Sequence, residues 1–194
     1  MSKEKYFKAF FGVEPNSIRS KVIISPIIYP QQFEKLIGRK GQSYKSILSY
    51  LVVNFNDLTF IKTPMTQAAV ADLVALLPQT KCREVFFVGA VAALQKEAQI
   101  GDVFISSRAK DFFSVKSMHD ETQRKLAELR KKGVVGIDFE SRPFFREAKK
   151  ANLSAVACFV ATDLPFSKPF YLSKTVEEKL LIQSSIAYII NAIK

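Results

Sequence analysis

The sequence predicts a three-layer α/β/α fold, with helices on both faces of a central β-sheet. Short apolar segments typical of buried strands alternate along the chain with segments typical of helices, and no internal repeat or low-complexity linker interrupts them. Two β-branched-rich strands, at 134–137 and 155–160, flank a helix at 142–150. We expect this unit to be a parallel crossover, with both strands ending at the same edge of the sheet.

The length of 194 residues suits one well-buried domain. We expect an N-terminal helical extension at residues 1–20 and a single domain at residues 21–194. The extension places four aromatic residues on or near one helical face and ends at Gly12 and Pro15, so it should pack on the domain or on a partner subunit. Those aromatic residues are Tyr6, Phe7, Phe10 and Phe11.

The remaining elements follow from apolar runs and from the residues that interrupt them. Strands are expected at 21–28, 44–55, 58–62, 85–88 and 103–106. Helices are expected at 66–77, between two prolines, at 119–132 and at 175–193. In the helix at 142–150, Ser141 is the expected cap of the first turn and Pro143 is compatible with that turn.

Composition narrows the classes of partner. The formal charge of +11 would attract anions, but the basic residues are dispersed and no basic stretch is interleaved with aromatics, which argues against nucleic acid. No apolar run is long enough for a membrane span or a secretory core, so we expect a cytoplasmic protein with no membrane contact. Cys82 and Cys158 are expected to be reduced, buried thiols. No His or Cys cluster has metal-ligand spacing, so neither a metal nor a cofactor is expected.

Two carboxylates follow apolar strands and are the first candidates for a site. Glu140 lies after the strand at 134–137, and Asp163 lies after the strand at 155–160. Ligands of α/β proteins bind at the carboxyl edge of the sheet. The pattern alone also allows ordinary roles, with Glu140 as a first-turn acid of a helix and Asp163 as a turn residue before Leu164-Pro165.

Four segments, in this order, resemble the nucleoside phosphorylase and nucleosidase superfamily. They are DLTFIKTPMTQAAV (57–70), VFFVGAVAAL (85–94), IGDVFI (100–105), and DFES (138–141) together with ATD (161–163). The superfamily includes purine nucleoside and uridine phosphorylases and the methylthioadenosine/S-adenosylhomocysteine nucleosidases. The chain is identified as a shortened, divergent member. The resemblance implies a mixed, largely parallel central sheet, a nucleoside as ligand with phosphate as a second candidate, and a homo-oligomer, either a dimer or a hexamer.

The resemblance also implies residue roles. Glu140 would accept hydrogen bonds from both ribose hydroxyls, with Phe139 against the sugar. Asp163 would be the catalytic acid that protonates or hydrogen-bonds a purine nitrogen as the glycosidic bond breaks, which requires a raised pKa. The other implied positions are Val91, Ala92 and Thr162 in the base pocket, and Ser25, Gly89 and Ala90 in the phosphate or water region.

Several positions depart from the superfamily pattern. Phe87 and Ala90 stand where many hexameric phosphorylases have an Arg and a hydroxyl residue that contact phosphate. Glu34 is the remaining candidate for the Glu with which hydrolytic members activate water. The short interval between Arg108 and Asp138 removes part of the expected base cover, for which Phe112, Phe113 or a neighbouring subunit could substitute. His119, the only histidine, is interpreted as a helix-start residue.

The expected function is therefore cleavage of the N-ribosyl bond of a purine-type nucleoside. Water is favoured over phosphate as the nucleophile, because Phe87 and Ala90 remove phosphate contacts. The alternative is a catalytically inactive relative that binds a nucleoside-like ligand or acts as an assembly partner. Retention of Glu140 and Asp163 favours the enzyme, and the missing groups for handling a nucleophile favour the alternative.

Overall fold

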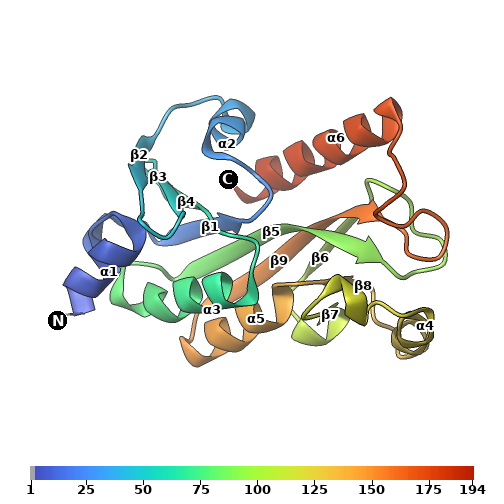
Figure 1. The fold of residues 1–194 in the computed structure, drawn as a ribbon. Helices are drawn as coiled ribbons and strands as arrows, with labels where there is room; N and C mark the ends of the chain where they lie inside the picture. Colours follow the sequence, from blue (N-terminus) through green and yellow to red (C-terminus); the bar gives the residue numbers. More distant parts are fainter. Residues whose placement is uncertain (1–2) are drawn as a thin grey trace.

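The computed structural model describes residues 3–194, in which helices cover both faces of one nine-stranded sheet (Figure 1). The strands are β1 (Lys21–Ser25), β2 (Gln42–Lys45), β3 (Leu51–Asn54), β4 (Leu58–Lys62), β5 (Glu84–Ala93), β6 (Val103–Ser106), β7 (Phe112–Ser114), β8 (Gly136–Asp138) and β9 (Ser154–Asp163). The α-helices are α1 (Lys3–Phe11), α2 (Pro30–Ile37), α3 (Gln67–Leu76), α4 (Gln123–Lys131), α5 (Ser141–Lys150) and α6 (Val176–Ile193). Short 3-10 helices are η1 (Pro15–Ser17), η2 (Leu77–Gln79), η3 (Ala109–Asp111) and η4 (Met118–Asp120).

The sheet has a parallel centre and antiparallel additions. Strands β4, β1, β5 and β9 are neighbours in this order and all parallel. Antiparallel pairs add β3 to β4, β2 to β3, β6 to β9 and β8 to β5, while β7 runs parallel to β8. The mixed, largely parallel α/β/α architecture is therefore confirmed. The carboxyl ends of the four central strands share one edge, where ligands of such sheets bind.

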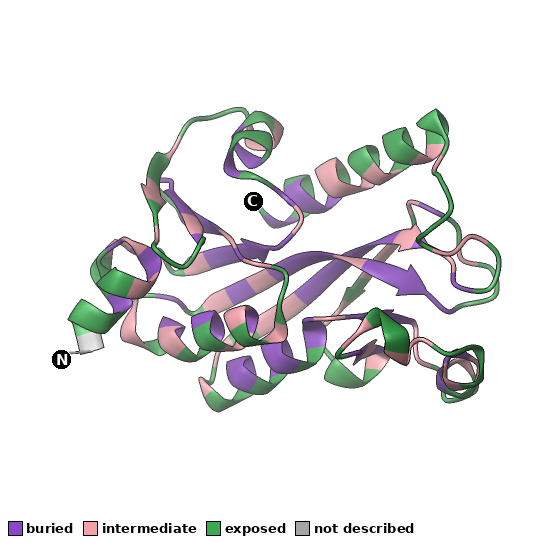
Figure 2. Ribbon diagram, in the orientation of Figure 1, coloured by how far each residue is buried: buried purple, intermediate pink, exposed green. Residues whose placement is uncertain are grey.

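Two apolar layers fill the spaces between the sheet and its helices. Figure 1 shows α2 and α6 on one face, with α1, α3 and α5 on the other, and Figure 2 shows buried residues along β5 and β9. The core beneath α1, α3 and α5 contains Phe7 and Phe11, whose side chains are fully buried. The N-terminal helix thus contributes to the main core. The predicted boundary between residues 20 and 21 stays a prediction.

Most predicted elements are present, and β4 and β6 have the predicted bounds. The strand expected at 21–28 ends at Ser25, because the Ser25 hydroxyl accepts hydrogen bonds from the backbone N–H groups of Ile27 and Ile28 and turns the chain. The long strand expected at 44–55 is a hairpin of β2 and β3, with Ser49 in the left-handed region at φ 65°. Helix α2 is absent from the sequence prediction, although Pro30 begins it and Gly38 ends it at φ 72°.

The predicted parallel crossover is wrong. Strand β8 pairs antiparallel with β5, whereas β9 pairs parallel with β5, so β8 and β9 run in opposite directions. The expected cap is also wrong, since Ser141 is the first residue of α5 and its N–H is bound by the Asp138 carboxylate at 2.7 Å. Local apolar runs predict strands but not the direction in which a short edge strand joins the sheet.

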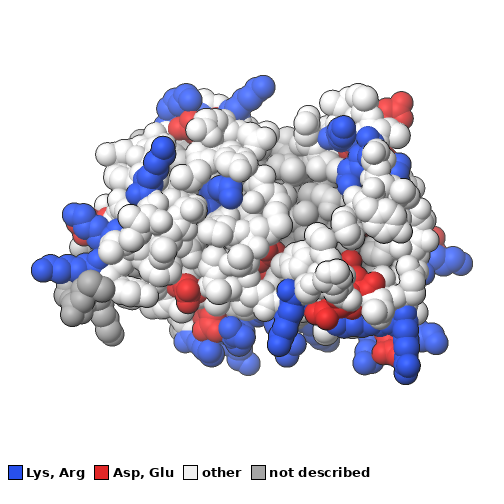
Figure 3. Space-filling model, viewed as in Figure 1, with Lys and Arg blue, Asp and Glu red and all other residues white. Residues whose placement is uncertain are grey.

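Other expectations concern the surface and the thiols. Cys82 and Cys158 are buried and unpaired. Figure 3 shows Lys and Arg side chains dispersed over the visible face rather than gathered into one patch, as their spread along the sequence suggests. Within residues 3–194, no helix has both the length and the apolar character needed to cross a bilayer. The cytoplasmic location and the homo-oligomer stay predictions.

Candidate functional site

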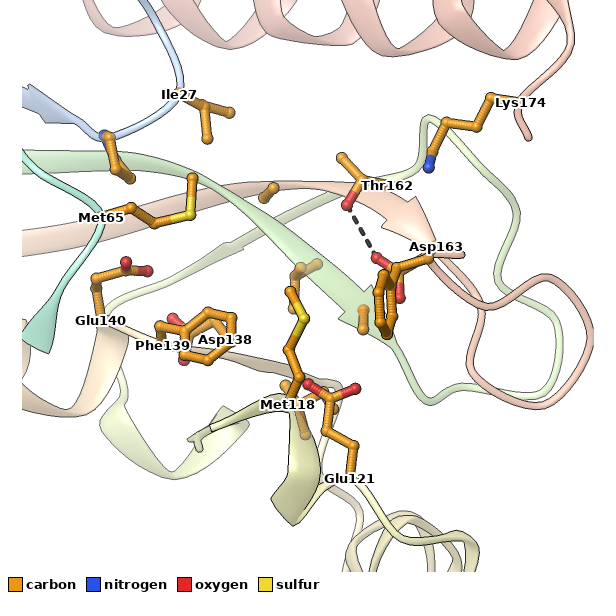
Figure 4. Close-up of a pocket in the computed structure, with 16 residues that line it drawn as sticks. Ile27, Met65, Met118, Glu121, Asp138, Phe139, Glu140, Thr162, Asp163 and Lys174 are labelled. Carbon is orange, nitrogen blue, oxygen red and sulfur yellow. Dashed lines mark hydrogen bonds between the residues drawn. The ribbon is translucent and has the colours of Figure 1, made fainter. Parts of the chain in front are cut away.

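A pocket of about 200 Å³ opens at the carboxyl edge of the parallel strands (Figure 4). The loops after β1 and β4 contribute apolar side chains, among them Ile27 and Met65, and β5 contributes Ala90–Ala92 as its floor. The segment between β8 and α5 closes one end, and the end of β9 closes the other. Because β8 runs against β5, its following residues lead back along the pocket instead of away from it.

The structure brings most of the predicted site residues together. Seven of the nine line this one pocket, and they come from β5, from the β8–α5 segment and from the end of β9. The seven are Ala90, Val91, Ala92, Phe139, Glu140, Thr162 and Asp163. Figure 4 shows Glu140 and Asp163 at opposite ends, with Phe139 beside the first carboxylate. Two side chains from distant parts of the sequence thus face one cavity.

Glu140 is a buried carboxyl group with an unused hydrogen-bonding atom. The residue is 4% exposed, and its Oε1 atom is buried without a hydrogen-bond partner among the described residues. It occupies the N-cap position of α5, yet its side chain makes no capping bond. Burial, and then the nearby charge of Asp138, raise the pKa of Glu140 to about 8. A buried unpaired acceptor is unfavourable, so this end of the pocket suits a ligand with hydroxyl donors.

Asp138 holds the segment that carries Glu140. Its Oδ1 atom accepts hydrogen bonds from the hydroxyls of Ser114 and Ser141, each at 2.8 Å, and its Oδ2 atom accepts the Ser141 N–H. Ser114 Oγ also accepts the N–H of Arg142 at 2.8 Å. These bonds connect β7, β8 and the start of α5, and they satisfy the first amides of the helix. Asp138, rather than Glu140, therefore has the helix-capping role.

Asp163 ends β9 at a bulge. The pairs Val91–Ala161 and Ala92–Asp163 are consecutive on β5 but skip Thr162 on β9, and bulges of this kind redirect side chains next to sites. The residue is 9% exposed, and its Oδ1 atom accepts the Thr162 hydroxyl at 3.0 Å. Burial raises the pKa of Asp163 above its ordinary value, against the opposing effects of Thr162 and Lys174. The geometry therefore suits a carboxyl group that can donate a proton.

Two predicted residues lie outside the pocket lining. The Ser25 hydroxyl is occupied by the turn after β1, as described above. Gly89 lies within β5, and a Cβ atom there would come within 2.7 Å of the Phe87 ring and 2.9 Å of the Phe159 ring. Its lack of a side chain thus serves ring packing in the core, and β5 continues through Gly89 to Ala93, beyond the strand expected at 85–88.

The other candidates named from the sequence, for water activation and for covering the base, lie outside the pocket. Glu34 accepts hydrogen bonds from Lys40 Nζ and the Gly41 N–H and does not line the pocket. Phe112 is buried in the main core, and Phe113 packs beneath the Lys125 ammonium group, so neither covers a base. His119 is an exposed residue of η4. In the part of the chain that the structure describes, no group of three or more His, Cys, Asp or Glu residues could hold a metal ion.

The sequence analysis missed several lining residues, above all Glu121, Phe170 and Lys174. Glu121 precedes α4, a helix whose i, i+4 charge pairs are typical of an ordinary exposed helix. Phe170 and Lys174 lie in the loop between β9 and α6, where no motif marks them. Lys174 is the only Lys or Arg among the described residues that line the pocket.

Comparison with solved structures identifies the class of fold. Over 97% of both chains, the protein is similar to uridine phosphorylase from Vibrio fischeri ES114 in complex with 6-hydroxy-1-naphthoic acid, at a TM-score of 0.76 and 14% identity. It is also similar to AMP nucleosidase from Bacteroides thetaiotaomicron VPI-5482, at a TM-score of 0.70 and 15% identity over 99% of this chain and 97% of that one. No protein-family model matches the sequence, and no curated protein matches it. The chain has the fold of the nucleoside phosphorylase and nucleosidase superfamily, which its motifs predicted.

Proposed function

We propose that the protein cleaves the N-ribosyl bond of a purine-type nucleoside, with water rather than phosphate as the nucleophile. The observation that carries this proposal is the placement of two buried carboxyl groups, Glu140 and Asp163, at opposite ends of one pocket. Their placement at opposite ends suits a ligand with a polyhydroxyl group at one end and a basic leaving group at the other. A nucleoside has this pattern.

The two carboxyl groups suit different steps. The unpaired Oε1 atom of Glu140 can accept hydrogen bonds from the 2′ and 3′ hydroxyls, which replaces an unsatisfied buried acceptor with a satisfied one. Asp163 in its protonated form can donate to a ring nitrogen of the base as the glycosidic bond lengthens. General acid catalysis of this kind contributes roughly 10²- to 10⁴-fold. Phe139 lies beside the sugar end, where its ring would exclude water.

The charge of the pocket supports water as the nucleophile. A phosphate dianion needs several donors, usually from Arg, hydroxyl groups and backbone amides. The described lining residues include four carboxyl groups but only one cation, Lys174, at the far end from Glu140. The carboxyl groups belong to Glu121, Asp138, Glu140 and Asp163. A phosphate dianion would therefore find only one cationic group among the described lining residues to bind it.

The second candidate is a protein that binds a nucleoside without cleaving it. One observation favours it: Glu34, the candidate for the base that activates water, is held by Lys40 and Gly41 and does not line the pocket. In that case the pocket retains recognition but lacks activation of the nucleophile.

The purified protein should release free base from at least one of adenosine, inosine, uridine and methylthioadenosine, as measured by liquid chromatography with and without phosphate. Asp163→Asn should lower the rate by about 10²- to 10⁴-fold while keeping the fold, because an amide cannot supply the proton. Glu128→Gln, an exposed change on α4, is the matched control. Absence of base release combined with nucleoside binding would support the second candidate. Absence of both would refute the proposal.

A further inference from the structure

The Asp163 end of the pocket holds a second carboxyl group that the proposed mechanism does not use. Glu121 lies between η4 and α4 and is partly buried. Its carboxylate accepts no hydrogen bond from the described residues, so a ligand that binds it has no such bond to displace. Figure 4 shows its side chain rising into the pocket from the side opposite Lys174, with Asp163 near the end of β9. A ligand between them would meet both carboxyl groups.

The electrostatics of this end favour one proton on the pair. Two neighbouring carboxylates disfavour simultaneous ionisation. Burial raises the pKa of Glu121, the charge of Asp163 raises it further, and Lys125 opposes both effects. On the other side, Thr162 and Lys174 oppose the effect of burial on the pKa of Asp163. With one group neutral and one ionised, the pair presents one donor and one acceptor. A ligand that carries an acceptor facing Asp163 and a donor facing Glu121 selects the form in which the shared proton lies on Asp163.

We propose that Glu121 and Asp163 together select a 6-aminopurine, with Asp163 donating to N7 and Glu121 accepting from the 6-amino group. This inference rests on the proposed function for its choice of a purine nucleoside. The N7 edge of adenine carries an acceptor and an adjacent amino donor, whereas the same edge of a 6-oxopurine carries two acceptors. A 6-oxopurine would direct its O6 atom at an ionised Glu121. Glu121 is thus a residue that determines specificity.

The preference should be visible in binding of the free bases, without any turnover. Calorimetric titration of the wild-type protein at neutral pH should give adenine a Kd at least about tenfold lower than that of hypoxanthine. The reason is that a hydrogen bond to a charged group is stronger than one between neutral groups. Glu121→Gln should bring the two Kd values within about threefold, because an amide can either accept from the amino group or donate to O6. Glu128→Gln, a Glu-to-Gln change on the exposed face of α4, should leave the ratio unchanged.

The ratio of kcat/KM for adenosine and inosine separates this inference from the proposed function. A preference for adenine that Glu121→Gln abolishes, without cleavage of either nucleoside, would support the recognition and refute the enzymatic proposal. Cleavage with equal use of adenosine and inosine, or a preference that survives Glu121→Gln, would overturn the role of Glu121 and leave the enzymatic proposal standing. Failure of both bases and both nucleosides to bind would overturn both.

Discussion

Nucleoside binding should depend on pH through the carboxyl group of Glu140, and the size of the dependence follows from the raised pKa of that group. The pKa of Glu140 is raised to about 8 by burial and by Asp138. Ribose hydroxyls donate hydrogen bonds to an ionised carboxylate far better than to a protonated one. The ligand therefore binds the ionised form, and binding below pH 8 requires the release of a proton.

The magnitude follows from the ionised fraction. Each pH unit below the pKa lowers that fraction about tenfold, which corresponds to about 1.4 kcal/mol. At pH 6, about one molecule in a hundred has an ionised Glu140, so the apparent Kd should be about 100-fold higher than at pH 9. Binding strengthens as pH rises through 8 and then levels off. The sign is opposite to that of a protonated Asp163, whose contribution declines with rising pH.

The measurement compares adenosine with 2′,3′-dideoxyadenosine by calorimetric titration between pH 6 and pH 9. Because the two ligands share the same base, the titration of Asp163 and Glu121 affects both affinities equally and does not change their ratio. The ratio should rise by about 100-fold over this range, with up to one proton released per adenosine bound at pH 6. Glu140→Gln should remove the rise, because its amide does not titrate. A ratio that stays constant in the wild-type protein, or falls toward pH 9, would refute the assignment of Glu140 to the ribose.

Two further predictions concern stability. Glu140→Gln should stabilise the protein at pH 9 by up to about 5 kcal/mol. Because the pKa of Glu140 is raised in the folded state, the free energy of unfolding of the wild-type protein falls as pH rises from about 4.5 to 8. Urea unfolding should therefore show little difference between the two proteins at pH 5. Gly89→Ala should destabilise the protein by roughly 1–3 kcal/mol, because the new Cβ atom meets the rings of Phe87 and Phe159. A small gain from the less flexible unfolded chain offsets part of this loss. Thermal unfolding measures the loss of stability, and an unchanged Tm would contradict the packing role of Gly89.

The fold class could be predicted because local patterns typical of strands and of helices alternate along the sequence. The apolar runs of β4 and β6 and the proline-bounded helix α3 appear with bounds equal or close to those expected. Helix α2 was missed although Phe33, Leu36 and Ile37 have helical spacing, because its eight residues show that spacing only once. The break between β2 and β3 was missed because apolar residues continue through the turn at Ser49.

Sequence motifs led to residues that share one pocket, whereas residues that reach the pocket only through contacts distant in the sequence were missed. Glu140 and Asp163 were found from segments that resemble a superfamily, and both line the pocket. Gly89 was assigned to the phosphate or water region, but the requirement for glycine there comes from the rings of Phe87 and Phe159. Nothing in the sequence near Glu121 distinguishes it from the other acids before and within α4.

The sequence by itself determined the alternation of strands and helices, the superfamily fold and the two carboxylates at strand ends, because each of these depends on neighbouring residues along the chain. Only the tertiary structure decided that β8 runs against β5, so that Glu140 turns back to face the cavity it shares with Asp163. Tertiary packing also decided which carboxyl groups lose their water, and therefore that the pKa values of Glu140, Asp163 and Glu121 are raised. Desolvation depends on everything that surrounds a side chain, and most of those neighbours come from distant parts of the sequence.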